Sequence, residues 1–256
     1  MPTISRLIVS GVDYRLVKPQ QLHAVACMLL DDEGTHRDAR KEWAIGPIRG
    51  DDAGRVVVMT LRALTDVVSY RLRHRAAQGT RLVFGEQEGT IVDGPELLTE
   101  ATWDELSEPV SPPPPAWRIE FMSPTALSSH RRLTPLITPS SLLGSLSRRW
   151  ESLWGRGGDG VNPWLPRLGE HELDHIWVTD VAGRTVTTAV PHTTGRAVAD
   201  KVLPGFVGDM VLQCDDPMVA QAVDCYLRFA RFAGVGALTT HGFGTVDVHA
   251  ARLKDT

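Results

Sequence analysis

The chain has 256 residues, of which 42% are hydrophobic and 23% are charged, so it can bury a core without disulfides or metal. No apolar run reaches the ~18 residues of a membrane helix, and the first residues lack the long apolar region of a secretory signal. We therefore expect a cytoplasmic protein with no membrane partner. Cys27, Cys214 and Cys225 have no C-x-x-C spacing, so we predict buried apolar cysteines, no metal site and no cofactor.

The net charge of −4 does not by itself favour a nucleic-acid partner, but the charge is unevenly distributed. The segment from Glu86 to Glu108 contains eight acidic residues and no lysine or arginine, so the remainder of the chain carries +4. Arginine also far exceeds lysine, with 23 residues against 4. The planar guanidinium group suits phosphates and base edges. The charge thus permits nucleic-acid binding without indicating it, and a general bias toward arginine explains the same counts.

A run of four prolines at residues 112–115 is the clearest domain boundary. Consecutive prolines restrict φ and lack backbone donors, which favours an extended spacer. We predict an amino-terminal domain over residues 1–108, a proline-rich linker over 109–116, and a carboxyl-terminal domain over 117–256.

The pattern of the amino-terminal half predicts the element order βαββαβ. Residues 3–14 are rich in β-branched and apolar side chains, as in a strand. Apolar residues at helical spacing predict a helix over 18–31 and a second over 64–77. The second helix is expected to bury Leu64, Val67, Val68 and Leu72. Further strands are expected at 43–48, 55–61 and within 81–92.

The carboxyl-terminal half repeats this order more loosely. Trp117, Ile119 and Phe121 alternate with polar neighbours, as in a half-buried strand, and Thr138-Pro139 is typical of a helix start. Strand-like segments, a helix and a final strand follow at 174–179, 185–190, 205–213, 216–232 and 243–248. The chain is therefore predicted to be α+β, with two tandem ferredoxin-like βαββαβ domains.

A glycine-rich segment, GVGALTTHGFG at residues 234–244, lies between the last predicted helix and the last strand. It is not a dinucleotide-binding fingerprint, because Thr239 stands where the third glycine is needed and a strand follows instead of a helix. It is not a Walker loop, because G-K-[ST] is absent. The glycines instead indicate a backbone that closely approaches something, either a packed neighbour or a phosphate chain. A tight turn that closes the fold is the simpler alternative.

The glycine-rich segment resembles the carboxyl-terminal signature of the CRISPR repeat-RNA processing endoribonucleases, the sixth Cas family of the RAMP superfamily. Three further motifs of that family occur in the expected order. They are a strand running into Ser123-Pro124-Thr125, a helix ending in Arg148-Arg149-Trp150, and a G-x-x-G strand at Gly205–Gly208. The resemblance covers residues 117–248, and the amino-terminal half agrees with it only in element order.

The resemblance implies two domains similar to RNA-recognition motifs, which bind CRISPR repeat RNA and cleave precursor crRNA once within the repeat. Cleavage in such enzymes resembles an internal transesterification without metal, in which the ribose 2′-hydroxyl attacks the adjacent phosphate. It leaves a 5′-hydroxyl and a 2′,3′-cyclic phosphate. Other Cas subunits of a surveillance complex are further possible partners of such a protein.

Members of this family often place a catalytic histidine just after the first helix, which implies His36 as general acid or base. By the same positional argument Lys41 stabilises the phosphate, and Arg37 and Arg40 bind flanking phosphates. An exposed loop histidine among solvated charges is the alternative. His23, inside the first predicted helix, is the runner-up catalytic residue, although a partly buried core position explains it equally well.

Other candidate RNA contacts lie in the carboxyl-terminal half. His130, Arg131 and Arg132 follow the S-P-T strand and are candidate phosphate contacts, with a solvated loop as the alternative. Arg148 and Arg149 flank an apolar helix face and are expected to be solvated. The candidates in the glycine-rich segment are Gly234, Gly236, His241, Gly242 and Gly244.

One motif points to a different class of protein. Residues 171–175 have the sequence HELDH, which matches the H-E-x-x-H pattern of zinc metalloproteases. That chemistry needs both imidazoles on one side of a helix, whereas the residues after His175 favour a strand. In a strand, residues four apart are about 13 Å apart and cannot share a metal.

Three hypotheses therefore stay open. The first is a metal-independent endoribonuclease, the second a non-catalytic RAMP subunit that binds guide RNA, and the third, more remote, a zinc hydrolase.

Overall fold

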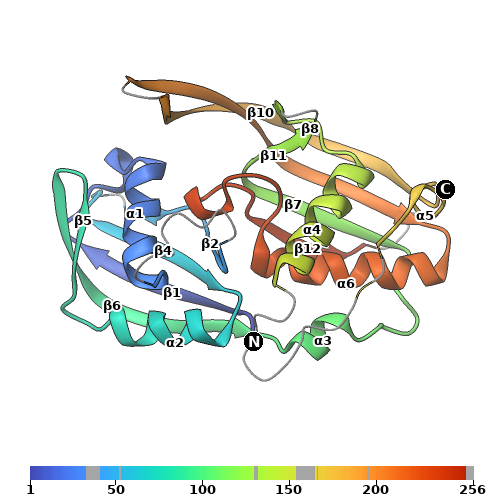
Figure 1. Ribbon diagram of the computed structural model, residues 1–256, viewed down its shortest axis with the longest axis horizontal. Coiled ribbons are helices and arrows are strands. Elements are labelled where there is room, and N and C mark those ends of the chain that lie inside the picture. The colour runs from blue at the N-terminus through green and yellow to red at the C-terminus, as the bar shows by residue number, and fades with distance from the viewer. Residues whose placement is uncertain are drawn as a thin grey trace.

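The computed structural model describes residues 1–32, 41–51, 53–129, 132–153, 165, 167–194 and 197–251. Two antiparallel sheets, each covered on one face by two helices, lie side by side in the molecule (Figure 1). No helix within these ranges is long and apolar enough to cross a membrane.

The amino-terminal half is a ferredoxin-like βαββαβ unit with added strands. Its sheet order is β2-β4-β1-β6-β5, with the short β3 paired to β4. The four strands β2-β4-β1-β6 follow the ferredoxin-like order, and β5 adds a hairpin. The elements are β1 (Thr3–Ser10), η1 (Tyr14–Leu16), α1 (Pro19–Leu30), β2 (Trp43–Ile45), β3 (Arg49–Gly50), β4 (Val56–Ala63), α2 (Asp66–Arg75), β5 (Arg81–Phe84) and β6 (Gln87–Glu100).

The carboxyl-terminal half is a second unit of the same kind. Its sheet order is β10-β11-β7-β12. The remaining strands, β8 and β9, form a separate small hairpin. The elements are α3 (Trp103–Ser107), β7 (Ala116–Thr125), β8 (Leu127–Ser129), β9 (Arg132–Thr134), α4 (Pro139–Leu153), α5 (Glu170–Leu173), β10 (Ile176–Thr194), β11 (Ala197–Cys214), α6 (Pro217–Ala233), η3 (Thr239–His241) and β12 (Val246–Ala250). The predicted α+β class and the double ferredoxin-like fold are confirmed.

Several predicted boundaries are wrong. The region 81–92 contains two strands, and β6 continues through much of the acidic segment to Glu100. The two short strands expected at 174–179 and 185–190 are one strand, β10, which pairs with β11 along its whole length. This hairpin projects from the second sheet toward the side of α1 (Figure 1).

Each half has a hydrophobic core of its own. In β1, alternate residues are buried, and Leu7 and Val9 pack under α1 and α2. Helix α2 begins at Asp66. Val67, which was expected to be buried on its inner face, is 46% exposed. In the second half, α4 and α6 meet through Trp150 and Phe229, whose rings lie edge to face with centroids 5.0 Å apart.

The second core also includes residues that precede the proline run. Leu106 of α3 and Leu64, which follows β4, both pack into it. The chain therefore begins to pack into the second core soon after the end of β6, before the proline run.

Buried polar contacts join the two halves. Arg62 of β4 donates a 3.0 Å hydrogen bond to the hydroxyl of Thr245, and Arg149 of α4 donates a 3.1 Å hydrogen bond to the carbonyl of Trp43. Burial lowers the pKa of each arginine to about 10. Nearby Asp247 and Glu42 partly offset this effect for Arg62 and Arg149 respectively.

The glycine-rich turn closes the second half by packing backbone against backbone. The amide of Gly244 donates to the carbonyl of Pro124 at 3.1 Å, and that of Ala237 donates to the carbonyl of Ala126 at 2.9 Å. Gly236 has φ of 80°, and a Cβ there would lie 2.3 Å from the carbonyl oxygen of Ala126. The turn therefore has a packed neighbour, the S-P-T strand and the residue after it, which was one of the two predicted explanations.

We expect Gly236→Ala to destabilise the protein more than Gly79→Ala does. Both glycines have positive φ, but a Cβ at Gly79 meets nothing within 4 Å. The backbone strain alone should cost about 1–2 kcal/mol at Gly79, and the clash with Ala126 should add about 1–3 kcal/mol at Gly236. Urea unfolding of the two variants measures the difference. Equal losses would show that the turn has room for a side chain.

Candidate functional site

The glycine-rich turn lies between α1 of the first half and α4 of the second, so three groups of polar side chains meet around it. These groups are a histidine pair, a buried ion pair at the end of α1, and an arginine-lined pocket.

The histidine pair consists of His23 on α1 and His241 in the turn. Their rings stack with centroids 4.1 Å apart and an interplanar angle of 5°. Nδ1 of His23 lies 2.9 Å from the carbonyl oxygen of Thr240, which can only accept, so this nitrogen carries the proton. Nε2 of His23 lies 3.4 Å from the sulfur of Cys27. Both ring nitrogens of His23 therefore already have partners.

Burial shifts the pKa of two groups at this contact. It lowers the pKa of His241 to about 4, and repulsion from His23 adds to the effect. Burial likewise raises the pKa of the Cys27 thiol to about 12, and the nearby carboxylate of Asp31 acts in the same direction. The runner-up catalytic residue is thus part of a contact between the two halves.

The ion pair joins Lys41 to Asp31, which caps the end of α1. Their side chains are only 8% and 4% exposed, and Nε1 of Trp43 donates to the other oxygen of Asp31 at 2.6 Å. Burial acts to raise the pKa of Asp31, but the hydrogen bonds from Lys41 and Trp43 outweigh it and lower that pKa. Lys41 was expected to contact phosphate, but its ammonium group contacts a buried carboxylate. The sequence offered no signal for Asp31 or Trp43.

Several of the predicted site residues lie outside the described part of the chain. Arg132 is described; it lies in β9 and is exposed. The residues outside are His36, Arg37, Arg40, His130 and Arg131.

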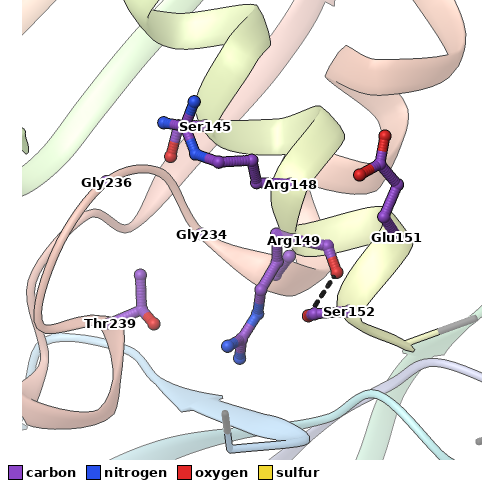
Figure 2. A pocket seen from close by; sticks show the side chains of 9 residues that line it. Ser145, Arg148, Arg149, Glu151, Ser152, Gly234, Gly236 and Thr239 are labelled. Atoms are coloured by element: carbon purple, nitrogen blue, oxygen red, sulfur yellow. Dashed lines mark hydrogen bonds between the residues drawn. The ribbon is translucent and has the colours of Figure 1, made fainter. Parts of the chain in front are cut away.

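The arginine-lined pocket lies between α4 and the glycine-rich turn and has a volume of about 560 Å³. Arg148 and Arg149 leave α4 in different directions, and Thr239 lies across the pocket from them (Figure 2). Arg149 is half-buried, and its Nε is buried with no acceptor within the described residues. The expectation that both arginines are solvated is therefore wrong for Arg149 and right for Arg148, which is exposed.

A second and more apolar pocket, of about 240 Å³, lies on the other side of the turn. It is lined by His241 and Gly242 together with apolar side chains from both halves, among them Leu22, Met122 and Phe243. The predicted site residues of the turn are therefore divided between two pockets. Gly234 and Gly236 line the first, and His241 and Gly242 line the second.

The HELDH segment was expected to be a strand that keeps its two histidines about 13 Å apart. This expectation is wrong, because the segment begins in a helix. Residues 170–173 form the short helix α5, and the rings of His171 and His175 lie 5.6 Å apart. Two of the three functional side chains of the motif, Glu172 and His175, already have hydrogen-bond partners. Glu172 accepts from the amide of Gly169 at 2.9 Å, and Nδ1 of His175 contacts Asp215 at 2.8 Å, which raises the pKa of His175. Among the described residues, no three His, Cys, Asp or Glu side chains are grouped to hold a metal ion.

Solved structures share the fold over almost the whole chain. The Cas6 protein TTHA0078 in a product complex matches with a TM-score of 0.70 and 24% identity, covering 97% of this chain and 100% of that one. The Cas6 protein TTHB231 in a product complex matches with a TM-score of 0.70 and 20% identity, over 97% and 100%. A further structure of Thermus thermophilus Cas6 (TTHB231) matches with a TM-score of 0.66 and 19% identity, covering 97% of this chain and 98% of that one.

No match was found among curated proteins. The model of the CRISPR-associated endoribonuclease Cas6 family, however, matches residues 119–246, which is half of the chain and includes β7, α4, the β10–β11 hairpin, α6 and the glycine-rich turn. With both ferredoxin-like halves also in place, the chain belongs to the Cas6 family of CRISPR-associated endoribonucleases.

Proposed function

We propose that this protein binds CRISPR repeat RNA and cuts precursor crRNA once within the repeat, without a metal ion. The observation that carries the proposal is that the family match and the full-length fold agree. TTHA0078 and TTHB231, which share both halves of the fold, have each been captured with product, and TTHA0078 also with a substrate mimic.

The reaction is an attack within the RNA itself. A base takes the proton of the ribose 2′-hydroxyl, and the oxygen bonds to the adjacent phosphorus. The bond from phosphorus to the 5′ oxygen breaks, and an acid protonates that oxygen. The products are a 2′,3′-cyclic phosphate and a 5′-hydroxyl. The protein has to align the attack, exchange two protons and stabilise charge on the phosphate.

His36 is the proposed acid or base. An exposed imidazole titrates near neutrality, and the two other histidines near α1 are stacked on each other, with His23 also bonded to the carbonyl of Thr240. A variant of TTHA0078 with a histidine replaced by alanine has also been solved, and that histidine lies close to the amino terminus, as His36 does here. Arg37 and Arg40 remain the proposed contacts to flanking phosphates, as do His130, Arg131 and Arg132 in the second half.

Lys41 has a different role in this proposal from the one the sequence suggested. Because its ammonium group is buried against Asp31, we propose that it fixes the chain where the segment after α1 ends, and does not itself contact the reacting phosphate. His23 is likewise proposed to hold α1 to the glycine-rich turn.

A non-catalytic RNA-binding subunit is the second candidate. A RAMP protein that binds different RNA substrates has the same fold, with a TM-score of 0.50 and 11% identity over 96% of this chain. The fold alone therefore does not separate a nuclease from a binder, and only the chemistry of cleavage can.

Incubation with the repeat RNA of the neighbouring array in excess EDTA tests the proposed reaction. We expect a cut at one position in each repeat, with 5′-hydroxyl and 2′,3′-cyclic phosphate ends, because the nucleophile belongs to the RNA and no ion is required. End-specific labelling and primer extension identify the ends. RNA that shifts in a gel but stays intact would favour the binder, and 5′-phosphate ends would exclude transesterification.

His36→Ala should lower the single-turnover cleavage rate by ~10²–10⁴-fold, because one positioned proton-transfer group typically contributes that much. Its affinity for repeat RNA should change little. His249→Ala is the matched control, since His249 is an exposed histidine on β12. A control variant that slows as much as His36→Ala, or a His36→Ala variant that cuts normally, would contradict the assignment.

Lys41→Met should cost about 3–5 kcal/mol of unfolding free energy near pH 7, because it leaves the carboxylate of Asp31 buried without its cation. The native pKa of Asp31 is lowered, so the pair stabilises the fold above the unfolded pKa of about 4. In the variant that pKa rises above the unfolded value, so protonation relieves the penalty and the loss should shrink toward about pH 4.5.

Urea unfolding at the two pH values measures this effect, with Lys18→Met as an exposed lysine control. A Lys41→Met variant that keeps its stability but loses cleavage would instead restore the catalytic role suggested by the sequence.

A further inference from the structure

We infer that the outer face of α2 binds an unpaired nucleotide of the RNA. The base stacks on the side chains of Tyr70 and His74, and arginines of the same helix bind the adjoining phosphates. The inference rests on the proposed function, because it takes repeat RNA as the ligand. It names a contact in the first half that neither the sequence nor the family motifs assigned.

An exposed pair of aromatic rings lies on this face. Tyr70 is 58% exposed, and its ring lies against the ring of His74, with centroids 3.8 Å apart and an interplanar angle of 31°. Nδ1 of His74 lies 2.8 Å from the carbonyl oxygen of Tyr70, which can only accept, so this nitrogen carries the proton. The hydrogen bond fixes the imidazole beside the phenol ring. Exposed aromatic rings of this kind stack on any base, since every base has a π face.

Apolar side chains adjoin the two rings. Val67, Tyr70 and His74 are spaced i, i+3 and i+7, so they lie on one face of α2, and Val67 is 46% exposed. Met28 of α1 is 45% exposed, and it lies next to α2 because Arg75 donates to its carbonyl at 3.1 Å. The rings are thus the centre of an exposed apolar surface, and a flat apolar ligand removes that surface from water.

The same helix carries an excess of positive charge. Its ten residues include Arg71, Arg73 and Arg75 but one carboxylate, that of Asp66, which is bound by the amino-terminal ammonium group. Arg71 forms an ion pair with Asp32 at 2.7 Å. Within the described ranges, neither Arg73 nor Arg75 forms an ion pair. Two cations of α2 are therefore left for an anionic ligand.

Of these two cations, Arg75 is the better placed to bind a phosphate. Its guanidinium group donates to the carbonyls of Met28 and Asp31, which holds it at the end of α1. These carbonyls carry no net charge, so the charge of Arg75 stays unbalanced. Arg73 instead lines a small groove together with Glu100 of β6, whose carboxylate offsets part of its charge without an ion pair.

The order of these groups across the surface matches a nucleotide in a strand. Arg71 and Arg75 lie one turn apart on the side of α2 that contacts α1, and both donate to carbonyls at the end of that helix. The rings lie beside them, so a base on the rings directs its phosphate toward the arginines. Stacking combined with phosphate contacts fits RNA better than an apolar protein segment, which has no anionic group to offer. From the end of α1 the chain continues into the segment that contains His36, so RNA held on α2 is anchored beside the start of that segment.

The test measures equilibrium binding of full-length variants to repeat RNA that carries 2′-deoxyribose at the mapped cleavage position. Tyr70→Ala should weaken binding by ~5–150-fold, the range expected when one base loses its aromatic partner. Tyr70→Phe should bind as the wild type does, because stacking needs the ring and not the hydroxyl. Since Tyr70 is exposed, urea unfolding of both variants should match that of the wild type. Equal affinities of the wild type and Tyr70→Ala would overturn the inference, as would an equal loss in the two variants.

Arg75→Gln tests the phosphate contact. This variant keeps an amide donor for the carbonyls of α1 but lacks the charge. The dependence of log affinity on log salt should therefore fall by about 0.7, the value for one phosphate on single-stranded RNA. Arg81→Gln is the matched control, because Arg81 is exposed on β5 of the same half and its loss changes the net charge equally. An equal fall in both variants would show an effect of net charge alone and would overturn the contact.

Ultraviolet crosslinking of the wild type to the same RNA locates the contact without any substitution. After digestion, mass spectrometry should find a nucleotide attached to Tyr70 or His74. Crosslinks confined to other segments would overturn the inference.

The same samples separate this inference from the proposed function. If the wild type binds and cuts repeat RNA and Tyr70→Ala does so equally well, the inference alone fails. If the wild type binds RNA without cutting it and Tyr70→Ala binds more weakly, the proposed reaction fails and the inference holds. If the wild type binds no repeat RNA, both fail. A Tyr70→Ala variant that binds RNA normally but loses self-association in sedimentation would identify a protein contact, which also overturns the inference.

Discussion

The arrangement of this protein depends on the close packing of the glycine-rich turn against the end of β7. Hydrogen bonds to the carbonyls of Pro124 and Ala126 hold the turn, and the room for a side chain at Gly236 is taken by a carbonyl oxygen. A turn fixed in this way is rigid enough to serve as a contact surface. Its tip reaches the first half, where the carbonyl of Thr240 accepts from His23 of α1. The same segment therefore closes one domain, fixes the other against it and separates two pockets.

Two arginines at the boundary between the halves differ in how they are surrounded by protein. Arg62 is buried and Arg149 is half-buried there, and neither forms an ion pair with a carboxylate among the described residues. Arg62 is enclosed between β4 and Thr245, so only the protein can solvate it. Arg149 borders an open pocket instead. The two arginines at this boundary therefore lie in different surroundings, one enclosed by protein and one facing a pocket.

The fold was readable from the sequence where alternation or helical spacing reflects a single buried face, as in β1 and β7. It was not readable where pairing between strands far apart in the sequence determines the length of an element. Strand β10 continues because β11 pairs with it along its length, with one register shift between Val178 and Asp180, although Gly183 interrupts the local pattern. The site shows the same limit. The motifs located the turn, but nothing near Arg149 indicates that the carbonyl of Trp43, 106 residues away, accepts its hydrogen bond. Lys41 appeared to be a free loop cation only because its partner Asp31 is not adjacent in sequence.

Burial also decides which histidine can exchange protons near neutral pH. Proton transfer in both directions needs a group whose charged and neutral forms are both accessible. Burial lowers the pKa of His241 to about 4, so its neutral form dominates near pH 7, while the two ring nitrogens of His23 contact a carbonyl and a thiol. The stack joins α1 to the turn, with ring centroids 4.1 Å apart, and in the proposed reaction proton exchange is assigned to a histidine outside it.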